Sequence, residues 1–222
     1  MRGDLTDRWS IIYRPTDGLS RGNMNKRAEQ RLATSQRILS AATRMFAQQG
    51  FEETSIESLL EELQISRGAL YHHFDSKEKI FRAAFEAVES DVEAAIVNAT
   101  RGITDPVEAL RTGCDTFLKM VRDETVRRIA LIDAPTVLGW QQWREIDAQH
   151  GFGLLKKSLQ AAAAEGRIRP ELVEVYGHIL LASLMETALV IARANNSAAV
   201  TRNGRAAITE LIGRLLGEPR RR

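Results

Sequence analysis

The stretch from Thr54 to Phe81, TSIESLLEELQISRGALYHHFDSKEKIF, constrains the fold more than any other part of the chain. Its apolar residues recur at helical spacing in two short segments, which a tight turn at Gln64 and Ile65 separates, and a longer helical pattern follows. Two such short helices bury little apolar surface alone. A third helix, Thr34 to Gln49, supplies the missing apolar face. The sequence therefore predicts a three-helix helix-turn-helix domain followed by a connecting helix.

Capping patterns mark where these helices begin. Thr54 and Glu57 have the T-x-x-E spacing of a capping box, so we expect a helix to start directly after Thr54. Ser66 is placed to cap the second short helix, which runs from the next residue to about position 72. Asp75 and Glu78 repeat the capping pattern at the start of the connecting helix.

A family resemblance rests on helix-spaced apolar residues, a Leu-Tyr-x-His-Phe segment and a Ser-Lys-Glu helix start. The residues concerned are Phe46, Gly50, Phe51, Thr54, Ile56, Ile65-Ser66-Arg67-Gly68, Leu70-Tyr71-His72-His73-Phe74 and Ser76-Lys77-Glu78. This pattern covers roughly Gln36 to Ala87 and resembles the DNA-binding domain of the TetR/AcrR family of repressors. One departure lies at the turn, where the family usually has Ala-Gly-Val and this chain has Leu63-Gln64-Ile65. A glutamine in the left-handed conformation is strained, so we expect a slightly different turn.

The second helix of a helix-turn-helix enters the major groove, where each base pair shows a distinct pattern of donors and acceptors. Arg67 can make a bidentate contact to guanine. Gly68 and Ala69 have almost no side chain, so the helix backbone can approach the DNA closely there. His72 can reach a base edge or a phosphate. The resemblance implies phosphate contacts from Thr54, Tyr71, His73 and Lys77. The alternative is that Tyr71 and His73 pack on the first helix and that Lys77 is only solvated. The expected DNA-binding residues are Thr54, Ser55, Ser66, Arg67, Gly68, Ala69, Tyr71, His72, His73 and Lys77.

The net charge of +2 is too small to explain DNA binding by itself, so the position of the charges matters. Basic residues gather before and within the first predicted helix, with Glu29 as the acid among them: Arg21, Lys26, Arg27, Arg31, Arg37 and Arg44. Such a basic stretch suits a phosphate-facing surface. A solvated charged face is the alternative interpretation.

The rest of the chain has helical periodicity and no strand alternation, which predicts an all-α protein with a C-terminal helical ligand-binding and dimerisation domain. We expect an arm at residues 1–30, the helix-turn-helix domain at 31–75, the helical domain at 76–217 with its connecting helix at 76–100, and a basic tail at 218–222. Residues 1–23 do not fit the family pattern, so Met24 is a candidate start of translation. Further helices are predicted at 106–121, 127–132, 171–195 and 205–216, and the helical pattern at 137–165 is interrupted by Gly151 and Gly153.

The resemblance implies an effector pocket in the second domain and a homodimer. Candidate pocket residues are Phe117, Met120, Trp140, Trp143, Phe152, Met185 and Glu186. The alternative is that they fill the core and that Glu186 pairs with Arg193 or with a dimer mate. By their order and apolarity, Glu171–Asn195 and Arg205–Leu216 correspond to the paired helices of the family's dimer. A monomer that buries both helices in its own core is the alternative.

Several classes of function find no support in the sequence. Cys114 is the only cysteine, which excludes an intramolecular disulfide and suits a reducing cytoplasm. The most apolar stretch, Ile179 to Ala192, is short for a membrane span, and no signal peptide pattern opens the chain. His72 and His73 are neighbours and diverge on a helix, so we expect no metal. We also expect no cofactor and no enzymatic activity, because no phosphate loop or catalytic signature is present.

Three interpretations therefore compete. A ligand-responsive repressor that binds a palindromic operator as a homodimer fits the resemblance best. A regulator controlled by a protein partner, or an activator, is the second. The third is a helical interaction module that does not bind DNA. Sequence-selective, salt-dependent DNA binding separates the third from the others.

Overall fold

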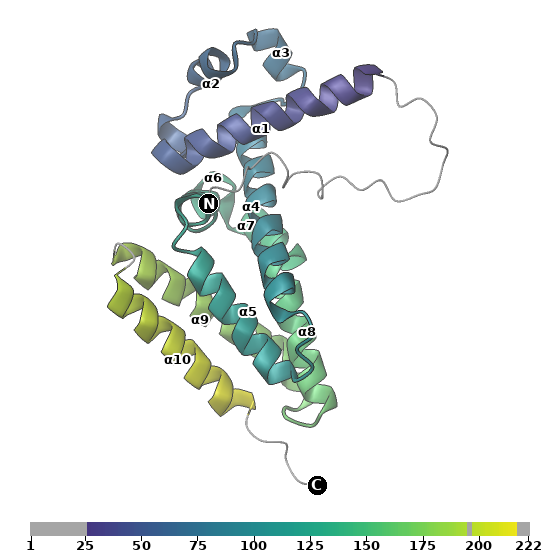
Figure 1. Ribbon diagram of the computed structural model, residues 1–222, viewed down its shortest axis with the longest axis vertical. Coiled ribbons are helices and arrows are strands. Elements are labelled where there is room, and N and C mark those ends of the chain that lie inside the picture. Colours follow the sequence, from purple (N-terminus) through teal and green to yellow (C-terminus); the bar gives the residue numbers. More distant parts are fainter. Residues whose placement is uncertain (1–25, 195–196, 217–222) are drawn as a thin grey trace. The chain divides into compact units, whose positions relative to one another are not determined.

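The computed structural model describes residues 26–194 and 197–216, and all the regular structure in these residues is helical, as the sequence predicts (Figure 1). The predicted arm up to residue 25 and the tail at 218–222 lie outside the described residues. The helices are α1 (Lys26–Glu53), α2 (Ile56–Leu63), α3 (Arg67–Tyr71), α4 (Lys77–Thr100), α5 (Pro106–Met120), the π-helix η2 (Val126–Asp133), α6 (Ala134–Val137), α7 (Gly139–Gln149), α8 (Gly151–Ala164), the 3-10 turn η3 (Pro170–Leu172), α9 (Val173–Arg193) and α10 (Ala198–Leu216).

Contacts between residues divide the chain into two units, Met1–Ala87 and Val88–Arg222. The division falls within α4, which gives its first turns to the first unit and the rest of its length to the second. The sequence placed the domain boundary at residues 75 and 76, directly before this helix. Each unit has its own buried core, and each is described separately below.

Three buried phenylalanine rings pack together in the core of the first unit. Phe46 and Phe51 come from α1, and Phe81 comes from α4. The ring of Phe81 packs edge-on against both others, with centroids 5.2 Å apart in each pair. Gly50, at φ +88°, redirects the chain so that Phe51 folds back toward Phe46, as expected of a helix-ending glycine. The helix itself begins at Lys26, eight residues before the predicted start, so residues 26–30 of the predicted arm are helical.

The helices α2, α3 and α4 start close to their predicted positions, but two caps were assigned to the wrong residues. Ser55, not Thr54, caps α2, in a capping box with Ser58 rather than Glu57. At the start of α4 the hydroxyl of Ser76, not Asp75, accepts the Lys79 N–H at 3.3 Å. At the start of α2, Ser55 and Ser58 lie one residue after Thr54 and Glu57, so the sequence permits a capping box from either pair. The serine pair satisfies the free N–H groups at the start of the helix.

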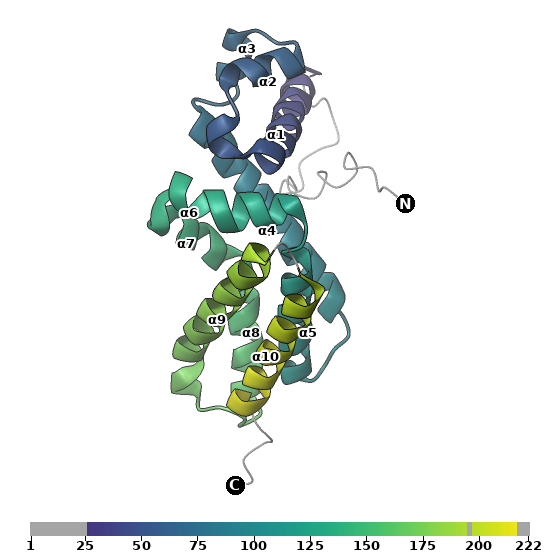
Figure 2. The ribbon, with the colours of Figure 1, turned by 90° about the vertical axis from the view of Figure 1, so that its left-hand side faces the viewer.

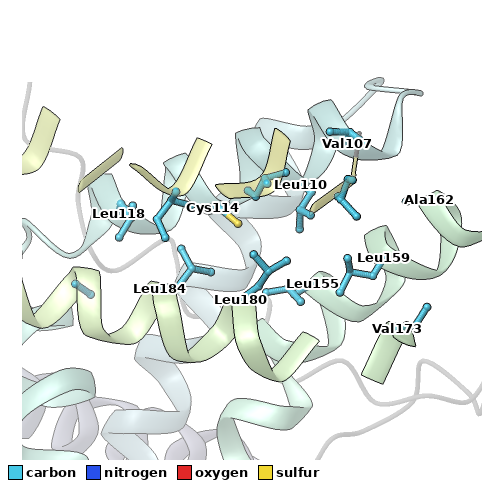
Figure 3. Packing of buried hydrophobic residues seen from close by; sticks show 14 of the residues in the cluster. Val107, Leu110, Cys114, Leu118, Leu155, Leu159, Ala162, Val173, Leu180 and Leu184 are labelled. Atoms are coloured by element: carbon cyan, nitrogen blue, oxygen red, sulfur yellow. The ribbon is translucent and has the colours of Figure 1, made fainter. Parts of the chain in front are cut away.

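In the second unit, α5, α8, α9 and α10 pack around one apolar core (Figures 2 and 3). The Asp105 side chain caps α5 by accepting the N–H groups of Val107 and Glu108, and Pro106 occupies the first turn. Leu118, Leu159 and similar side chains fill the core. The buried residues that line it in Figure 3 include Val107, Leu110, Cys114, Leu118, Leu155, Leu159, Ala162, Val173, Leu180 and Leu184.

Two helices of this unit differ from the prediction, and the stretch 137–165 is interrupted as expected. This stretch forms two helices, α7 and α8, which meet at His150 (φ −111°, ψ −94°), directly before Gly151. The predicted helix at 127–132 is π-helical and one residue longer at each end. The last helix begins at Ala198, seven residues early, and Gly204 lets it approach α9, since an added Cβ there would lie 2.8 Å from a methyl carbon of Thr187.

By length and composition alone, residues Pro170–Arg193 would suffice to cross a membrane. Packing within the second unit accounts for much of this apolarity, because Leu180, Leu184 and Ile191 are buried in the core. Only 39% of the most apolar window is buried within the chain, however. The helix therefore also carries an apolar face that the chain itself does not cover.

Candidate functional site

The turn between α2 and α3 is set by one residue in the left-handed conformation. Gln64 has φ +53° and ψ +45°, so it adopts the left-handed conformation despite the strain that led us to expect a different turn, and its side chain donates a 2.7 Å hydrogen bond to the Glu61 carbonyl oxygen. Ser66 then caps α3 by accepting the Ala69 N–H at 3.2 Å, also as predicted. Within the described residues, no other residue besides glycine has a positive φ. The turn thus sets the direction in which the chain continues from α2 into α3.

One face of α3 is buried and the other is open. Leu70 is fully buried against the domain core, whereas Arg67, Gly68 and His72 are exposed. A Cβ added to Gly68 would meet no atom within 4 Å, so the backbone there is accessible from outside. Tyr71 is exposed as well. The structure therefore brings the predicted base-contacting residues together on the outer face of one short helix.

Arg67 does not stand alone on this face, because its guanidinium pairs with the Glu57 carboxylate of α2. Both side chains are more than half exposed. A backbone hydrogen bond, and then the bond from Arg67, lower the pKa of Glu57 below its ordinary value. The sequence pattern indicated a capping role for Glu57 and did not predict this pairing. The i, i+10 spacing across a helix-turn-helix offers no local signal for it.

Two predicted phosphate ligands are held inside the domain. The Thr54 side chain is fully buried, donates a 2.8 Å hydrogen bond to the Gly50 carbonyl oxygen and accepts one from Gln49. The Lys77 ammonium donates to the Phe51 carbonyl oxygen at 2.8 Å and lies 4.0 Å from the centre of the Phe51 ring. In this conformation both residues stabilise the domain rather than face a ligand.

The remaining predicted contacts lie at the edge of the same surface. Ser55 and Ser66 are exposed caps at the starts of α2 and α3. His73 is half-buried, with its ring edge-on to His72 at 5.6 Å, and burial lowers its pKa. On α1, Arg31 and Arg37 are exposed, while Arg44 pairs with Glu62. Arg21 and the side chains of Lys26 and Arg27 lie outside the described part of the chain.

A cavity of about 170 Å³ lies within the second unit, between α4, α5, η2, α7, α8 and α9. Of the seven predicted pocket residues, Phe117, Trp143 and Met185 line it. Most of the other lining groups are apolar, among them Val92, Ile96, Leu110, Ala130, Leu131, Leu154, Leu155, Leu181 and Leu184.

The other four predicted pocket residues do not line this cavity. Trp140 is 68% exposed, and Phe152 stacks on the His178 ring instead. Met120 is half-buried elsewhere on α5. Glu186 is not a pocket residue and follows the alternative interpretation, because its side chain is 66% exposed and pairs with Arg193 at 4.0 Å. The reason is helical phase, since the buried residues of α9 lie on the opposite face.

Two carboxyl groups that the sequence analysis missed lie at the cavity. Glu89 of α4 and Asp147 of α7 both line it. Burial, and then the charges of Asp147 and Glu93, raise the pKa of Glu89 to about 8. Burial also raises the pKa of Asp147 to about 6, against the opposing effects of Arg144 and His150. The cavity is therefore apolar with an acidic site in its wall.

An apolar stripe runs along the exposed side of α9. Val175, Ile179 and Val190 are 53%, 43% and 46% exposed, and with Ala182 they follow helical spacing on one face, which the exposed Glu186 interrupts between Ala182 and Val190. In Figure 2, α10 lies beside α9, and the two helices contact each other. Single exposed apolar residues are common, but a stripe of this length indicates an interaction surface.

In the residues that the structure describes, no three His, Cys, Asp or Glu side chains are grouped so that they could hold a metal ion. The Cys114 thiol is buried in the core, which raises its pKa to about 12. A thiol with so high a pKa is a poor nucleophile at neutral pH.

Comparison with known proteins assigns both units. Residues 38–84 match the family described as bacterial regulatory proteins of the tetR family, and residues 107–215 match the tetracyclin repressor-like C-terminal domain. The TetC protein of transposon Tn10 from Escherichia coli is 22% identical over 75% of this chain and 84% of its own. The transcriptional repressor NicS of Pseudomonas putida is 26% identical over 71% of this chain and 76% of its own.

Among solved structures, a TetR-family transcriptional regulator from Pectobacterium atrosepticum is 27% identical, with a TM-score of 0.74 over 88% of this chain and 100% of that one. The helix-turn-helix unit and the helical unit thus both match proteins of one family, whose members are DNA-binding regulators and not enzymes. The protein belongs to the TetR/AcrR family of helix-turn-helix transcriptional regulators.

Proposed function

We propose that this regulator is a repressor that binds a palindromic operator as a homodimer and releases it when a small effector binds. The observation that carries the proposal is the exposed outer face of α3, where Arg67, Gly68 and His72 stand together opposite the buried Leu70. The similarity to NicS, which is named a repressor, supports the sign of regulation.

Recognition rests on the exposed groups of α3 and its flanks. A bidentate contact from Arg67 to guanine contributes about 1–3 kcal/mol of discrimination. Gly68 admits the DNA close to the helix, and the Ala69 methyl group suits a thymine methyl. Ser55, Ser66, Tyr71, His72 and His73 lie around them and offer hydroxyl and imidazole groups to phosphates. Arg31 and Arg37 of α1 add exposed positive charge.

Before Arg67 contacts a base, its guanidinium leaves Glu57. Exposed ion pairs contribute little to stability, so this release costs little. Because a negative charge near the DNA also repels phosphates, Glu57 both positions Arg67 in the free protein and restrains its binding to arbitrary DNA.

The homodimer is proposed to form through α9 and α10, with the stripe Val175, Ile179, Ala182 and Val190 at its centre. Covering this stripe with a second copy removes apolar surface from water, which favours association. A two-fold dimer presents two copies of α3, and roughly 34–36 Å, one turn of DNA, separates half-sites in such complexes. A palindromic operator follows from this symmetry.

The cavity of the second unit is the proposed effector site, and α4 is the proposed link to the DNA-binding unit. The helix carries Glu89, Val92 and Ile96 at the cavity and Phe81 in the core of the first unit. An effector that prefers one position of α4 shifts the equilibrium toward it, with typical coupling energies of about 1–3 kcal/mol. As a DNA-binding regulator, the protein is expected to act in the cytoplasm.

The test is selection of bound sequences from random duplex DNA by the purified full chain at two salt concentrations. An enriched inverted repeat, whose binding weakens steeply as salt rises, supports the proposal. Weak binding without enrichment contradicts it and favours a helical interaction module. A reporter gene behind the selected site then shows whether the protein represses or activates.

A further inference from the structure

Two acidic side chains at the cavity bear on the chemistry of a ligand that could occupy it. Asp147 is only 4% exposed, and its Oδ2 atom has no hydrogen-bond partner. Arg144 is the nearest cation, with Nη1 at 3.5 Å from that oxygen, too far for a good hydrogen bond. A buried carboxylate oxygen without a donor is costly, so a native protein seldom keeps one without a reason.

Glu89 places a second carboxyl group at the same cavity. It interrupts the apolar stripe of α4 between Phe85 and Val92, where an apolar residue would pack better. Its neighbour Glu93 is already engaged, with Oε2 at 2.7 Å from Nδ1 of His150. The cavity thus receives two acidic groups while the neighbouring acid has its own partner.

The charged groups around the cavity are unequal in their access to it. Of the lining residues, only Glu89, Asp147, Cys114 and Lys157 titrate, and the Cys114 thiol is neutral at physiological pH. Lys157 of α8 is exposed, so solvent screens its charge. Arg144 and His150 flank Asp147 from α7 without lining the cavity. The buried wall is therefore acidic, and an anionic ligand is disfavoured there.

The volume of the cavity limits the size of the ligand. At about 170 Å³ it is slightly larger than the engineered apolar cavities of about 150 Å³ that bind benzene. Its walls are otherwise apolar and include the Trp143 and Phe117 rings. One aromatic ring or a branched alkyl group with a short polar arm fits this space.

We propose that the effector is a small apolar amine, whose ring or alkyl group fills the cavity and whose ammonium group donates hydrogen bonds to Asp147 and Glu89. This inference rests on the proposed effector role of the cavity and specifies its ligand class. A charged donor supplies the hydrogen bond that the Oδ2 oxygen of Asp147 lacks beside its 3.5 Å ion pair with Arg144, and charge-assisted hydrogen bonds are the stronger kind.

Binding of such a cation is coupled to proton release. Glu89, with its pKa raised to about 8, carries a proton at pH 7, whereas Asp147, at about 6, is mostly ionised. A bound ammonium group favours the ionised form of Glu89, so up to one proton leaves when the ligand enters. Affinity therefore rises with pH between about 6 and 8.

Three probes of matched size test the ligand class: benzylamine, benzyl alcohol and benzoate, titrated calorimetrically into the full chain. The amine is expected to bind about tenfold or more tightly than the alcohol, and benzoate weakest. Titration of benzylamine at pH 7 in two buffers of different ionisation enthalpy is expected to show proton release. Equal binding of amine and alcohol, preference for benzoate, or no binding of any probe at millimolar concentration overturns the proposal.

Two near-isosteric variants assign the site. Asp147→Asn and Glu89→Gln are each expected to remove most of the preference for the amine, and Glu89→Gln also removes the proton release. Glu145→Gln deletes an exposed carboxylate from the same helix as Asp147. It is expected to change neither the preference for the amine nor the proton release. Thermal melts establish that each variant is folded. An unchanged preference in folded Asp147→Asn and Glu89→Gln contradicts the assignment.

Operator binding, measured in parallel, separates the two proposals. If the chain binds its selected DNA but fails the probe tests, the ligand class is wrong and the DNA-binding function stands. If benzylamine binds as expected but the chain does not select DNA, the proposed function is wrong and the amine site stands.

Discussion

The Lys77 ammonium group binds Phe51 twice: it donates a 2.8 Å hydrogen bond to the carbonyl oxygen and lies 4.0 Å from the centre of the ring. The contact joins the start of α4 to the end of α1. It also lies beside the phenylalanine cluster, because Phe51 packs against Phe81, four residues after Lys77 on α4. A residue expected to hold a phosphate thus holds the DNA-binding unit together.

Replacing Lys77 by alanine is therefore expected to lower stability more than it alters DNA contacts. Hydrogen bonds to charged groups contribute about 1.5–3 kcal/mol, and partial exposure places this one near the lower end. Chemical denaturation of Lys77→Ala measures the loss, and DNA binding well below the melting temperature measures the salt slope. Lys79→Ala removes an exposed lysine two residues away and is the control. A stable Lys77→Ala variant whose salt slope falls by about one would instead identify a phosphate contact.

The pairing of Arg67 with Glu57 predicts opposite effects of two substitutions. Arg67→Ala is expected to lower the preference for the selected operator over scrambled DNA by about 1–3 kcal/mol. Glu57→Gln frees the guanidinium and removes a negative charge from the surface, so affinity for both DNAs is expected to rise about two- to fivefold. Competition binding with the two duplexes measures both effects.

Arg82→Ala serves as the control for Arg67→Ala, because Arg82 pairs with Glu86 on α4 rather than lying on the face of α3. If Arg67→Ala and Arg82→Ala reduce operator preference alike, base recognition lies elsewhere. A loss of affinity in Glu57→Gln would show that the ion pair is needed to position Arg67.

The helix-turn-helix could be predicted from the sequence because its signals are local. Gln64 sits at a turn between two apolar patterns, and Ser66 precedes a short helix, so both positions follow from spacing alone. The caps at Ser55 and Ser76 were missed because neighbouring hydroxyl and carboxyl groups compete for the same N–H groups. Such choices depend on geometry at the level of one residue.

The cavity could not be predicted in the same way. Glu186 was a candidate pocket residue because it is an acid within an apolar helix. Since α9 is apolar nearly all round, the sequence does not show which of its faces is buried. That face is set by packing against neighbouring helices such as α8 and α10. The useful signal lay in α4, where Glu89 occupies the stripe formed by Phe85, Val92 and Ile96. An acid that replaces one member of a well-defined apolar stripe is a stronger signal of a buried polar site than an acid on a uniformly apolar helix.

The apolar stripe of α9 predicts that Ile179→Glu disrupts the dimer. A buried, unpaired carboxylate at the centre of an interface is strongly unfavourable, so the dissociation constant is expected to rise by at least about tenfold. Sedimentation at several protein concentrations measures this change. Val97→Glu places the same charge at another exposed apolar residue, on α4, and is expected to leave the dimer intact. A monomeric wild-type chain, or dissociation caused by Val97→Glu alone, contradicts the proposed interface.

The raised pKa of Glu89 predicts that stability falls as pH rises. Folding raises this pKa from its ordinary 4.5 to about 8, so between these values the folded protein holds a proton that the unfolded chain has released. Stability is then lost progressively toward pH 8. The lowered pKa values of Asp105 and Asp115 have the opposite effect, but they act only in acid, below the ordinary value of 3.8.

Replacing Glu89 by glutamine isolates this effect from all others. Glutamine carries no proton that titrates, so Glu89→Gln does not share this loss of stability. The free energy of unfolding of Glu89→Gln minus that of the wild type is therefore expected to increase by roughly 2 kcal/mol from pH 6 to pH 8. Urea denaturation at several pH values, without ligand, measures the difference. Glu145→Gln removes an exposed carboxylate and is expected to follow the wild type throughout. A difference between Glu89→Gln and wild type that stays constant with pH would show that Glu89 is already ionised at neutral pH, and that the cavity holds two carboxylates rather than one carboxylate and one acid.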